Sequence, residues 1–118
     1  LGLEVDDRSR DGLCTLAAQI HNQVPVSTLV VHPVHHALAL NRDGKPSLVD
    51  GPFTPNPLIT TGAGDHFNAG FCLGKLLGFD NEQSVLIGVS TSGFYVRSGQ
   101  SPTIPDLVGM LQNWPKPA

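Results

Sequence analysis

The chain has 118 residues, which is enough for one modest domain with its own hydrophobic core. Its net charge is −3 and it has no block of basic residues, so composition gives no support to a nucleic-acid partner. Hydrophobic residues make up 40% of the chain, but no apolar run approaches the roughly 20 residues of a membrane-spanning helix. Composition therefore predicts a soluble globular protein that binds neither nucleic acid nor membrane.

The two cysteines, Cys14 and Cys72, have a spacing that matches neither a metal site nor a redox motif. Both fall in helix-like stretches, so we expect two small buried thiols in a reducing compartment. Glu4, Asp6 and Asp7 interrupt the start of the chain, which therefore lacks the pattern of a secretory signal peptide. The predicted location is the cytoplasm.

The first half of the chain is predicted to form strands around one helix. Residues 1–5 read as the end of a strand, and Asp6 or Asp7 is expected to cap a helix that ends near residue 22. Residues 27–32 form a nearly unbroken β-branched apolar run, which is typical of a buried parallel strand. Two more strands, joined by a turn at Asp43-Gly44, are predicted at residues 36–40 and 47–50.

Three helices are predicted for the second half. Residues 52–57 must be extended, because a residue that precedes proline avoids the helical region, and they lead into a glycine-rich turn. The helices that follow are expected at residues 65–77, 81–98 and 105–114. Small residues recur every four positions in the first two helices, which predicts close helix packing: Gly70, Gly74 and Gly78, then Ser84, Gly88 and Ser92.

This order of elements predicts an α/β layer with a mainly parallel sheet. Its chemistry is concentrated in the glycine turn, where Gly62-Ala63-Gly64 leaves the backbone unobstructed and Asp65 falls at the expected helix start. The first amides of a helix are unpaired and lie at the positive end of its dipole, so they bind anions. A carboxylate at such a site can take the proton from a group that attacks the anion. An ordinary turn, with Asp65 as the helix cap, stays open as the alternative.

A longer pattern extends this turn. Thr61-Gly62-Ala63-Gly64-Asp65-x-Phe67, followed by Asn68-Ala69-Gly70-Phe71, closely resembles the C-terminal signature of the ribokinase-like (PfkB) carbohydrate kinases. Residues 96–105 resemble the segment before the last helix of that family. The resemblance implies the C-terminal part of a Rossmann-like, three-layer α/β/α fold with a mainly parallel sheet. Family members are well over twice as long, so residues 1–118 would be the nucleotide-binding and catalytic portion, without the N-terminal substrate and lid portion.

The resemblance implies ATP-dependent phosphoryl transfer to the hydroxyl of a sugar or nucleoside-like acceptor, with ATP and Mg²⁺ as cofactors. Asp65 matches the catalytic base of the family. The anion hole is matched by the backbone amides of Gly62, Ala63, Gly64 and Asp65. The segment by itself is expected to be inactive, and the missing lid portion would carry any homodimer interface.

Two further pairs of residues match family binding positions. Ile87 and Ser90 fall on a helix that borders the adenine pocket in the family. Gly99, through its carbonyl, and Thr103, through its side chain, match positions that bind a monovalent cation, with K⁺ as the candidate here, in some members.

Departures from the family pattern support a second hypothesis, a non-catalytic domain that binds a nucleotide or phosphate. Ile59 stands where the family usually has Asp or Asn near the cation site, and Val34 and Ala37 stand where it tends to have glycines in a nucleotide-facing loop. The Asn-x-x-Glu motif that the family uses around Mg²⁺ and phosphate is absent from the chain. A purely structural or oligomerisation domain is a third hypothesis.

Histidines surround the loop at residues 32–36. His35 and His36 would point to opposite faces of a strand, so they are expected to line the nucleotide pocket or to be exposed, rather than to share a metal with His32. His66 follows Asp65 directly, but in a helix its side chain is expected to point away from that carboxylate.

Overall fold

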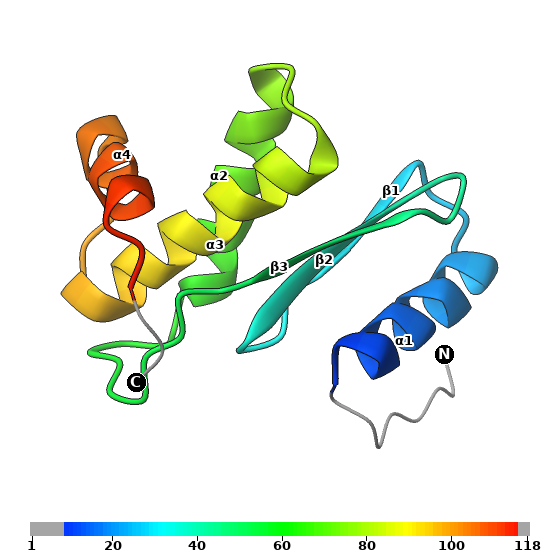
Figure 1. The fold of residues 1–118 in the computed structure, drawn as a ribbon, viewed down its shortest axis with the longest axis horizontal. Helices are drawn as coiled ribbons and strands as arrows, with labels where there is room; N and C mark the ends of the chain where they lie inside the picture. Colours follow the sequence, from blue (N-terminus) through cyan, green and yellow to red (C-terminus); the bar gives the residue numbers. More distant parts are fainter. Residues whose placement is uncertain (1–8, 116–118) are drawn as a thin grey trace.

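The computed structural model describes residues 9–115 and shows helices on both faces of a small sheet (Figure 1). The elements are α1 (Arg10–Gln23), β1 (Thr28–Val31), β2 (His36–Asn41), β3 (Pro46–Asp50), α2 (Ala63–Leu76), α3 (Asn81–Ser98) and α4 (Ile104–Gln112). Helix α1 covers one face of the sheet, α3 covers the other with α2 packed along it, and α4 packs on α3. The predicted α/β architecture is confirmed.

The sheet corrects the expected strand direction. Its order is β1-β2-β3, and both neighbouring pairs are antiparallel. The prediction of a mainly parallel sheet is therefore wrong for the described strands. Residues 32–35 and 42–45 join consecutive strands, and such short links suit antiparallel pairs, whereas a parallel crossover needs about a dozen residues or more. The strand predicted at residues 1–5 lies outside the described residues.

Strand β1 also differs from its expectation as a buried parallel strand. All four of its residues are half-buried, and its described neighbour is β2 alone, so it forms one edge of the described sheet. Strand β2 is instead the buried centre, because it pairs on both sides and carries helices on both faces.

The core consists of two clusters that share strand β2, since successive side chains of a strand point to opposite faces. One cluster joins β2 to α2 and α3 through Ala37, Ala39, Phe67, Val85 and Val89. The other joins β2 to α1 through Leu13, Ala17, Leu38 and Leu40. Small residues of β2 thus meet the helix pair that carries the glycine turn, and this places α3 close against the sheet.

Helices α2 and α3 approach closely at their glycines, as the spacing predicted. A Cβ atom added to Gly74 would lie 2.7 Å from Oγ of Ser84, and one added to Gly88 would lie 2.6 Å from the ring of Phe67. A Cβ atom on Gly70 would overlap with Oγ1 of Thr91. Glycine within a helix costs about 1 kcal/mol relative to alanine, and this tight contact offsets that cost.

The helix ends follow local signals. Helix α1 begins after Ser9, whose side chain accepts from the amide of Gly12, and the predicted caps at residues 6 and 7 lie outside the described residues. Asp80 and Gln83 form a reciprocal capping box at the start of α3, and Gly99 ends that helix with a φ of 72°. Within residues 9–115, no helix combines the length and hydrophobicity of a membrane span.

The cysteines correct one further expectation. Both thiols were expected to be buried. Cys14 is half-buried and packs against the core cluster of α1 and β2, but Cys72 is exposed. Cys72 lies between Gly70 and Gly74, which face α3, and a residue two positions away from each points to the opposite side of the helix.

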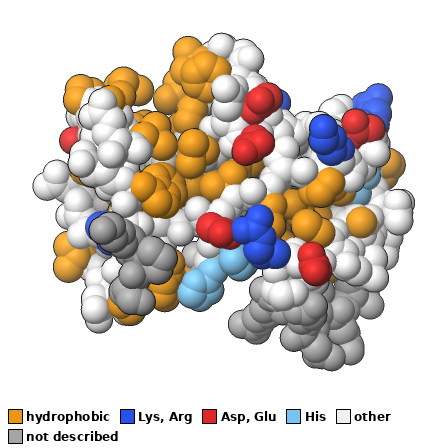
Figure 2. All heavy atoms as spheres, viewed as in Figure 1, with side chains coloured by type: hydrophobic (Ala, Val, Ile, Leu, Met, Phe, Trp, Pro, Cys, Tyr) orange, Lys and Arg blue, Asp and Glu red, His pale blue; other side chains and the backbone are white. Residues whose placement is uncertain are grey.

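On the face shown in Figure 2, hydrophobic side chains gather over the helical side, whereas charged side chains form small separate groups.

Candidate active site

The glycine turn places Asp65 in the first turn of α2. Gly62 is the N-cap, with φ 94° and ψ −2°, and the helix begins at Ala63. Asp65 is thus the third helical residue, and no side chain caps this end. The alternative of Asp65 as a helix cap is wrong. Its exposed carboxylate has no hydrogen-bond or ion-pair partner within residues 9–115, and it lies at the positive end of the helix dipole.

The backbone amides of the turn divide into free and occupied donors. The N–H of Ala63 donates to the carbonyl of Thr60 at 3.1 Å, which closes the turn. The N–H groups of Gly62, Gly64 and Asp65 have no acceptor in the described part of the chain. Three of the four amides expected for an anion hole are therefore available to a ligand, and Ala63 has a structural role instead.

Side chains from three segments meet behind this turn. The ring of His66 stacks on that of Tyr95, with centroids 3.7 Å apart and planes 12° apart. Nδ1 of His66 lies 2.8 Å from the carbonyl oxygen of Gly62, and Nε2 lies 2.8 Å from Oγ of Ser101. The Tyr95 hydroxyl donates to the carbonyl of Thr61 at 2.8 Å. These contacts were not predicted from the sequence. One of them has a local signal, since His66 follows Gly62 by four residues, about one helical turn.

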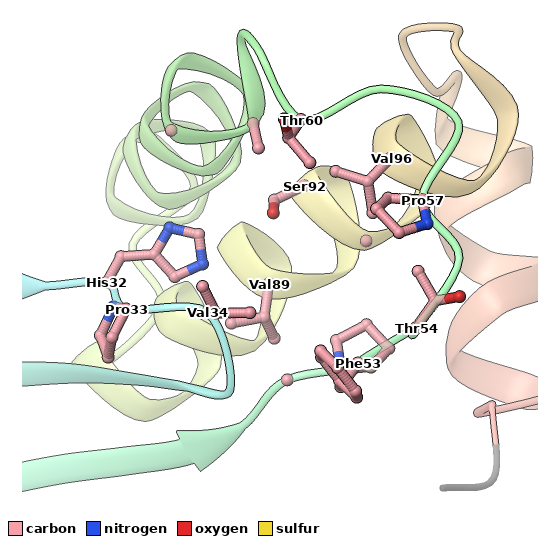
Figure 3. Close-up of a pocket in the computed structure, with 15 residues that line it drawn as sticks. His32, Pro33, Val34, Phe53, Thr54, Pro57, Thr60, Val89, Ser92 and Val96 are labelled. Atoms are coloured by element: carbon pink, nitrogen blue, oxygen red, sulfur yellow. The ribbon is translucent and has the colours of Figure 1, made fainter. Parts of the chain in front are cut away.

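A cavity of about 260 Å³ lies beside the turn (Figure 3). Its walls come from the loop after β1, the extended segment after β3, the glycine turn and α3. They include His32, Pro33, Val34, Phe53, Pro57, Thr60, Gly64, Val89, Ser92 and Val96. The lining is mostly apolar, with the hydroxyls of Thr60 and Ser92 among its few polar groups, and such a composition suits the flat, largely apolar surface of a nucleobase.

Hydrogen bonds to its backbone attach the extended segment after β3 to α3. The Arg97 guanidinium donates to the carbonyls of Pro52 and Phe53 at 2.8 and 2.9 Å. The amide of Leu58 donates to the carbonyl of Val96 at 2.8 Å. These bonds fix one wall of the cavity to the helix that forms another.

Ile87 and Ser90, predicted to border the adenine pocket, do not line this cavity. Ser90 is fully buried, and its hydroxyl donates to the carbonyl of Leu86 at 2.7 Å. The residues of α3 that face the cavity are Val89, Ser92, Gly93 and Val96. A nucleotide role for Ile87 and Ser90 stays a prediction.

The loop between β1 and β2 departs from the expected glycine positions in two ways. Val34 lines the cavity and is 76% exposed. Ala37 is instead a strand residue that is fully buried in the core beneath α3. Only the first of the two positions therefore faces the candidate nucleotide site.

Gly99 and Thr103 flank the short link between α3 and α4. The amide of Gly99 donates to the backbone carbonyl of Tyr95 at 2.7 Å, and Oγ1 of Thr103 accepts from the amide of Asp106 at 3.3 Å. Both residues thus end or begin a helix, and a cation at the Gly99 carbonyl stays a prediction. Within residues 9–115, no group of three His, Cys, Asp or Glu side chains is close enough to hold a metal ion.

A second, more open cavity of about 310 Å³ lies on the other side of the turn, between α2 and the start of α4. Its polar side chains are those of Asp65, His66, Thr91 and Ser101. Leu73, Ile104 and Leu107 are among its apolar ones. Because Gly64 lines the first cavity and Asp65 lines the second, the turn stands between the two.

His32 lines the first cavity and also contacts the core residue Phe67. Its ring stacks on Phe67, with centroids 4.0 Å apart, and burial lowers the pKa of His32 below its ordinary value of 6.5. Because of this lowered pKa, the unfolded chain binds more protons at this site than the folded one as the pH falls below 6.5. The contribution of neutral, buried His32 to stability is therefore fully present above this pH and is lost as the pH falls.

We expect the free energy of unfolding of the full-length protein to decrease from pH 7 to pH 5, and His32→Phe to reduce this decrease because phenylalanine can stack but cannot titrate. Chemical denaturation at several pH values measures both. His21→Phe is the control, since His21 lies at the end of α1, away from this core. An identical pH dependence in His32→Phe and the unmodified protein would contradict the assignment.

The family model for prokaryotic ketohexokinase matches residues 1–114. The chain belongs to this family. A ketohexokinase of Haloferax volcanii is 32% identical to it over 106 residues, which are 90% of this chain and 27% of that protein. This ketohexokinase-family chain therefore spans little more than a quarter of the relative's length. The predicted resemblance to PfkB carbohydrate kinases is confirmed.

Solved structures agree on the fold. A Methanocaldococcus jannaschii nucleoside kinase, an archaeal member of the ribokinase family, has a TM-score of 0.67 at 21% identity, over 95% of this chain and 46% of its own. The 2-dehydro-3-deoxygluconokinase of Thermotoga maritima has a TM-score of 0.68 at 15% identity, over 94% of this chain and 37% of its own. At these identities the likeness shows the ribokinase-like fold, shared by a chain of the ketohexokinase family.

Proposed function

We propose that residues 1–118 are the C-terminal nucleotide-binding and catalytic portion of an ATP-dependent sugar kinase. The family match and the named relatives support a carbohydrate kinase, and a ketohexose is the first acceptor to test. One observation carries the proposal: at the start of α2, the exposed carboxylate of Asp65 adjoins three backbone amides, and neither it nor they have a partner within residues 9–115. The substrate-binding portion would lie elsewhere in the full-length protein.

In the proposed reaction, Asp65 accepts the proton of the sugar hydroxyl as its oxygen attacks the γ-phosphorus of ATP. The bond from that phosphorus to the β,γ-bridging oxygen breaks, and ADP leaves with the bond's electron pair. The amides of Gly62, Gly64 and Asp65 stabilise the charge on the transferring phosphoryl group, a role in which preorganised donors are most effective. Ala63 supports the hole by closing the turn, through its bond to Thr60.

The nucleotide is placed in the first cavity, with its base against the apolar wall of α3 and its phosphates toward Gly64. The hydroxyls of Thr60 and Ser92 are within the lining and can orient the ligand. This arrangement leaves Asp65 on the opposite side of the turn, where an acceptor can approach it from the open second cavity. The cavities thus support separate access for donor and acceptor.

The proposal includes two metal ions, Mg²⁺ and K⁺. Asp65 is the sole acidic side chain of the turn, and within residues 9–115 no group of three His, Cys, Asp or Glu side chains could hold a metal ion. Mg²⁺ would neutralise phosphate charge with ATP bound, and K⁺ near Gly99 and Thr103 remains a proposal. The same holds for a cytoplasmic location and for a homodimer through the lid portion.

Exposed apolar side chains support the view that further protein covers this chain. Leu76 and Leu77, at the end of α2, are 85% and 59% exposed. Ile104 and Val108, one turn apart on α4, are 60% and 47% exposed.

The proposed kinase activity is tested with the full-length protein. Calorimetric titration with Mg²⁺–ATP measures nucleotide binding, and an ADP-coupled assay with a panel of ketohexoses, aldohexoses and nucleosides measures transfer. We expect ATP binding and sugar-dependent ADP release, with a ketohexose as the best acceptor. Binding without turnover on any acceptor would instead support the non-catalytic nucleotide-binding domain. Absence of ATP binding would refute both.

A further inference from the structure

We propose that His66, Tyr95 and Ser101 form a clamp that holds the glycine turn in the geometry needed for phosphoryl transfer. We call this group the turn clamp, and it makes His66, which also lines the second cavity beside Asp65, a positioning residue that acts through the backbone of the turn. The proposal rests on the proposed function of the turn as an anion hole.

The turn clamp acts on two successive carbonyls. The Tyr95 hydroxyl donates to Thr61, and His66 donates to Gly62 through both its ring Nδ1 and its backbone N–H, the latter at 3.1 Å. A trans peptide is planar, with its C=O and N–H pointing in opposite directions. The bond to the Thr61 carbonyl therefore aims the free N–H of Gly62 away from Tyr95. The bond to the Gly62 carbonyl likewise fixes the N–H of Ala63 on Thr60.

The contacts of His66 also define its tautomer. Its Nδ1 faces a carbonyl oxygen, which only accepts, so Nδ1 carries the proton. In the neutral ring Nε2 then accepts from the hydroxyl of Ser101. Stacking on Tyr95 holds the ring plane, so every polar atom of this imidazole and one of its faces are engaged by a different segment.

Gly62 fits this arrangement for two reasons. Its φ of 94° is a conformation that side chains disfavour, and a Cβ atom there would lie 3.1 Å from the Tyr95 hydroxyl. The turn clamp thus connects α2, α3 and the link to α4 at the point where the free amides are presented. A misplacement of about 1 Å at a reacting centre can reduce a rate about 100-fold, so a small shift of this turn is expected to lower kcat.

The test compares His66→Ala and His66→Asn in the full-length protein. We expect His66→Ala to lower kcat about 10-fold to 100-fold, with the KM of the sugar changed less than about twofold. The asparagine amide can replace the Nδ1 donor to Gly62, so His66→Asn is expected to recover part of kcat. Ser101→Ala, which removes the Nε2 partner, should give a smaller loss. His21→Ala is the matched control, because His21 also bonds a backbone carbonyl through its ring, at Val26, but lies in α1.

A second readout is independent of turnover. Amide NMR shifts of Gly62 and Gly64 on addition of ADP, Mg²⁺ and aluminium fluoride report whether the anion is held. We expect these shifts in the unmodified protein and their reduction in His66→Ala. Normal kcat and normal shifts in His66→Ala, or equal losses in His21→Ala, would overturn the turn clamp. If Asp65→Asn keeps its activity while His66→Ala loses the shifts, the base assignment fails and the clamp stands.

Discussion

Asp65→Asn is expected to lower kcat of the full-length protein by about 100-fold to 10,000-fold, since it removes the general base and little else. The side chain is exposed and has no partner within residues 9–115, so its replacement costs no packing or hydrogen bond there. Asparagine has nearly the same shape but cannot accept the proton of the sugar hydroxyl. The KM values for ATP and sugar, measured in the same coupled assay, should change far less than kcat.

Glu82→Gln provides the matched control. Glu82 is an exposed carboxylate in the first turn of α3, as Asp65 is in the first turn of α2. Both substitutions remove a negative charge that favours the positive end of a helix, worth about 0.3 to 1 kcal/mol. A drop in kcat confined to Asp65→Asn separates base catalysis from loss of helix stability. Near-normal kcat in Asp65→Asn would remove Asp65 from the role of base.

Gly70→Ala is expected to lower the free energy of unfolding by about 1 to 3 kcal/mol, because its methyl group would overlap with α3. The added atom meets Oγ1 and Cβ of Thr91 and, at 2.8 Å, the backbone carbonyl of Ile87. A backbone atom cannot move aside without shifting the helix, and α2 and α3 also hold the turn and the cavity wall. Chemical denaturation of the full-length protein measures the loss.

Gly109→Ala is the control with the opposite sign. Gly109 lies in α4, and a Cβ atom there would meet no atom of residues 9–115 within 4 Å. Alanine should therefore stabilise the helix by about 0.5 to 1 kcal/mol, through propensity alone. If Gly70→Ala were as stable as Gly109→Ala, the small residues would not set the distance between α2 and α3.

Local signals were sufficient for much of the secondary structure. Asp43-Gly44 predicted the β2–β3 turn, and Gly44 has a φ of 82° there. Gly78 and Gly99 predicted the ends of α2 and α3, with φ values of 81° and 72°. Such signals depend on the conformation of a few neighbouring residues, so a single sequence contains them. Strand direction does not depend on neighbouring residues alone: the apolar run at residues 27–32 predicts a parallel strand, but its pairing with β2 is antiparallel.

The glycine turn, the position of Asp65 beside it and the family resemblance could all be predicted from sequence, because each depends on one continuous stretch of residues. The tertiary structure alone decided which amides are free, since the N–H of Ala63 is taken by Thr60. It also decided what supports the turn, because Tyr95 and Ser101 are 34 and 35 residues from the groups they contact. Packing of α2 against α3 brings these distant side chains together, and no local pattern specifies that approach.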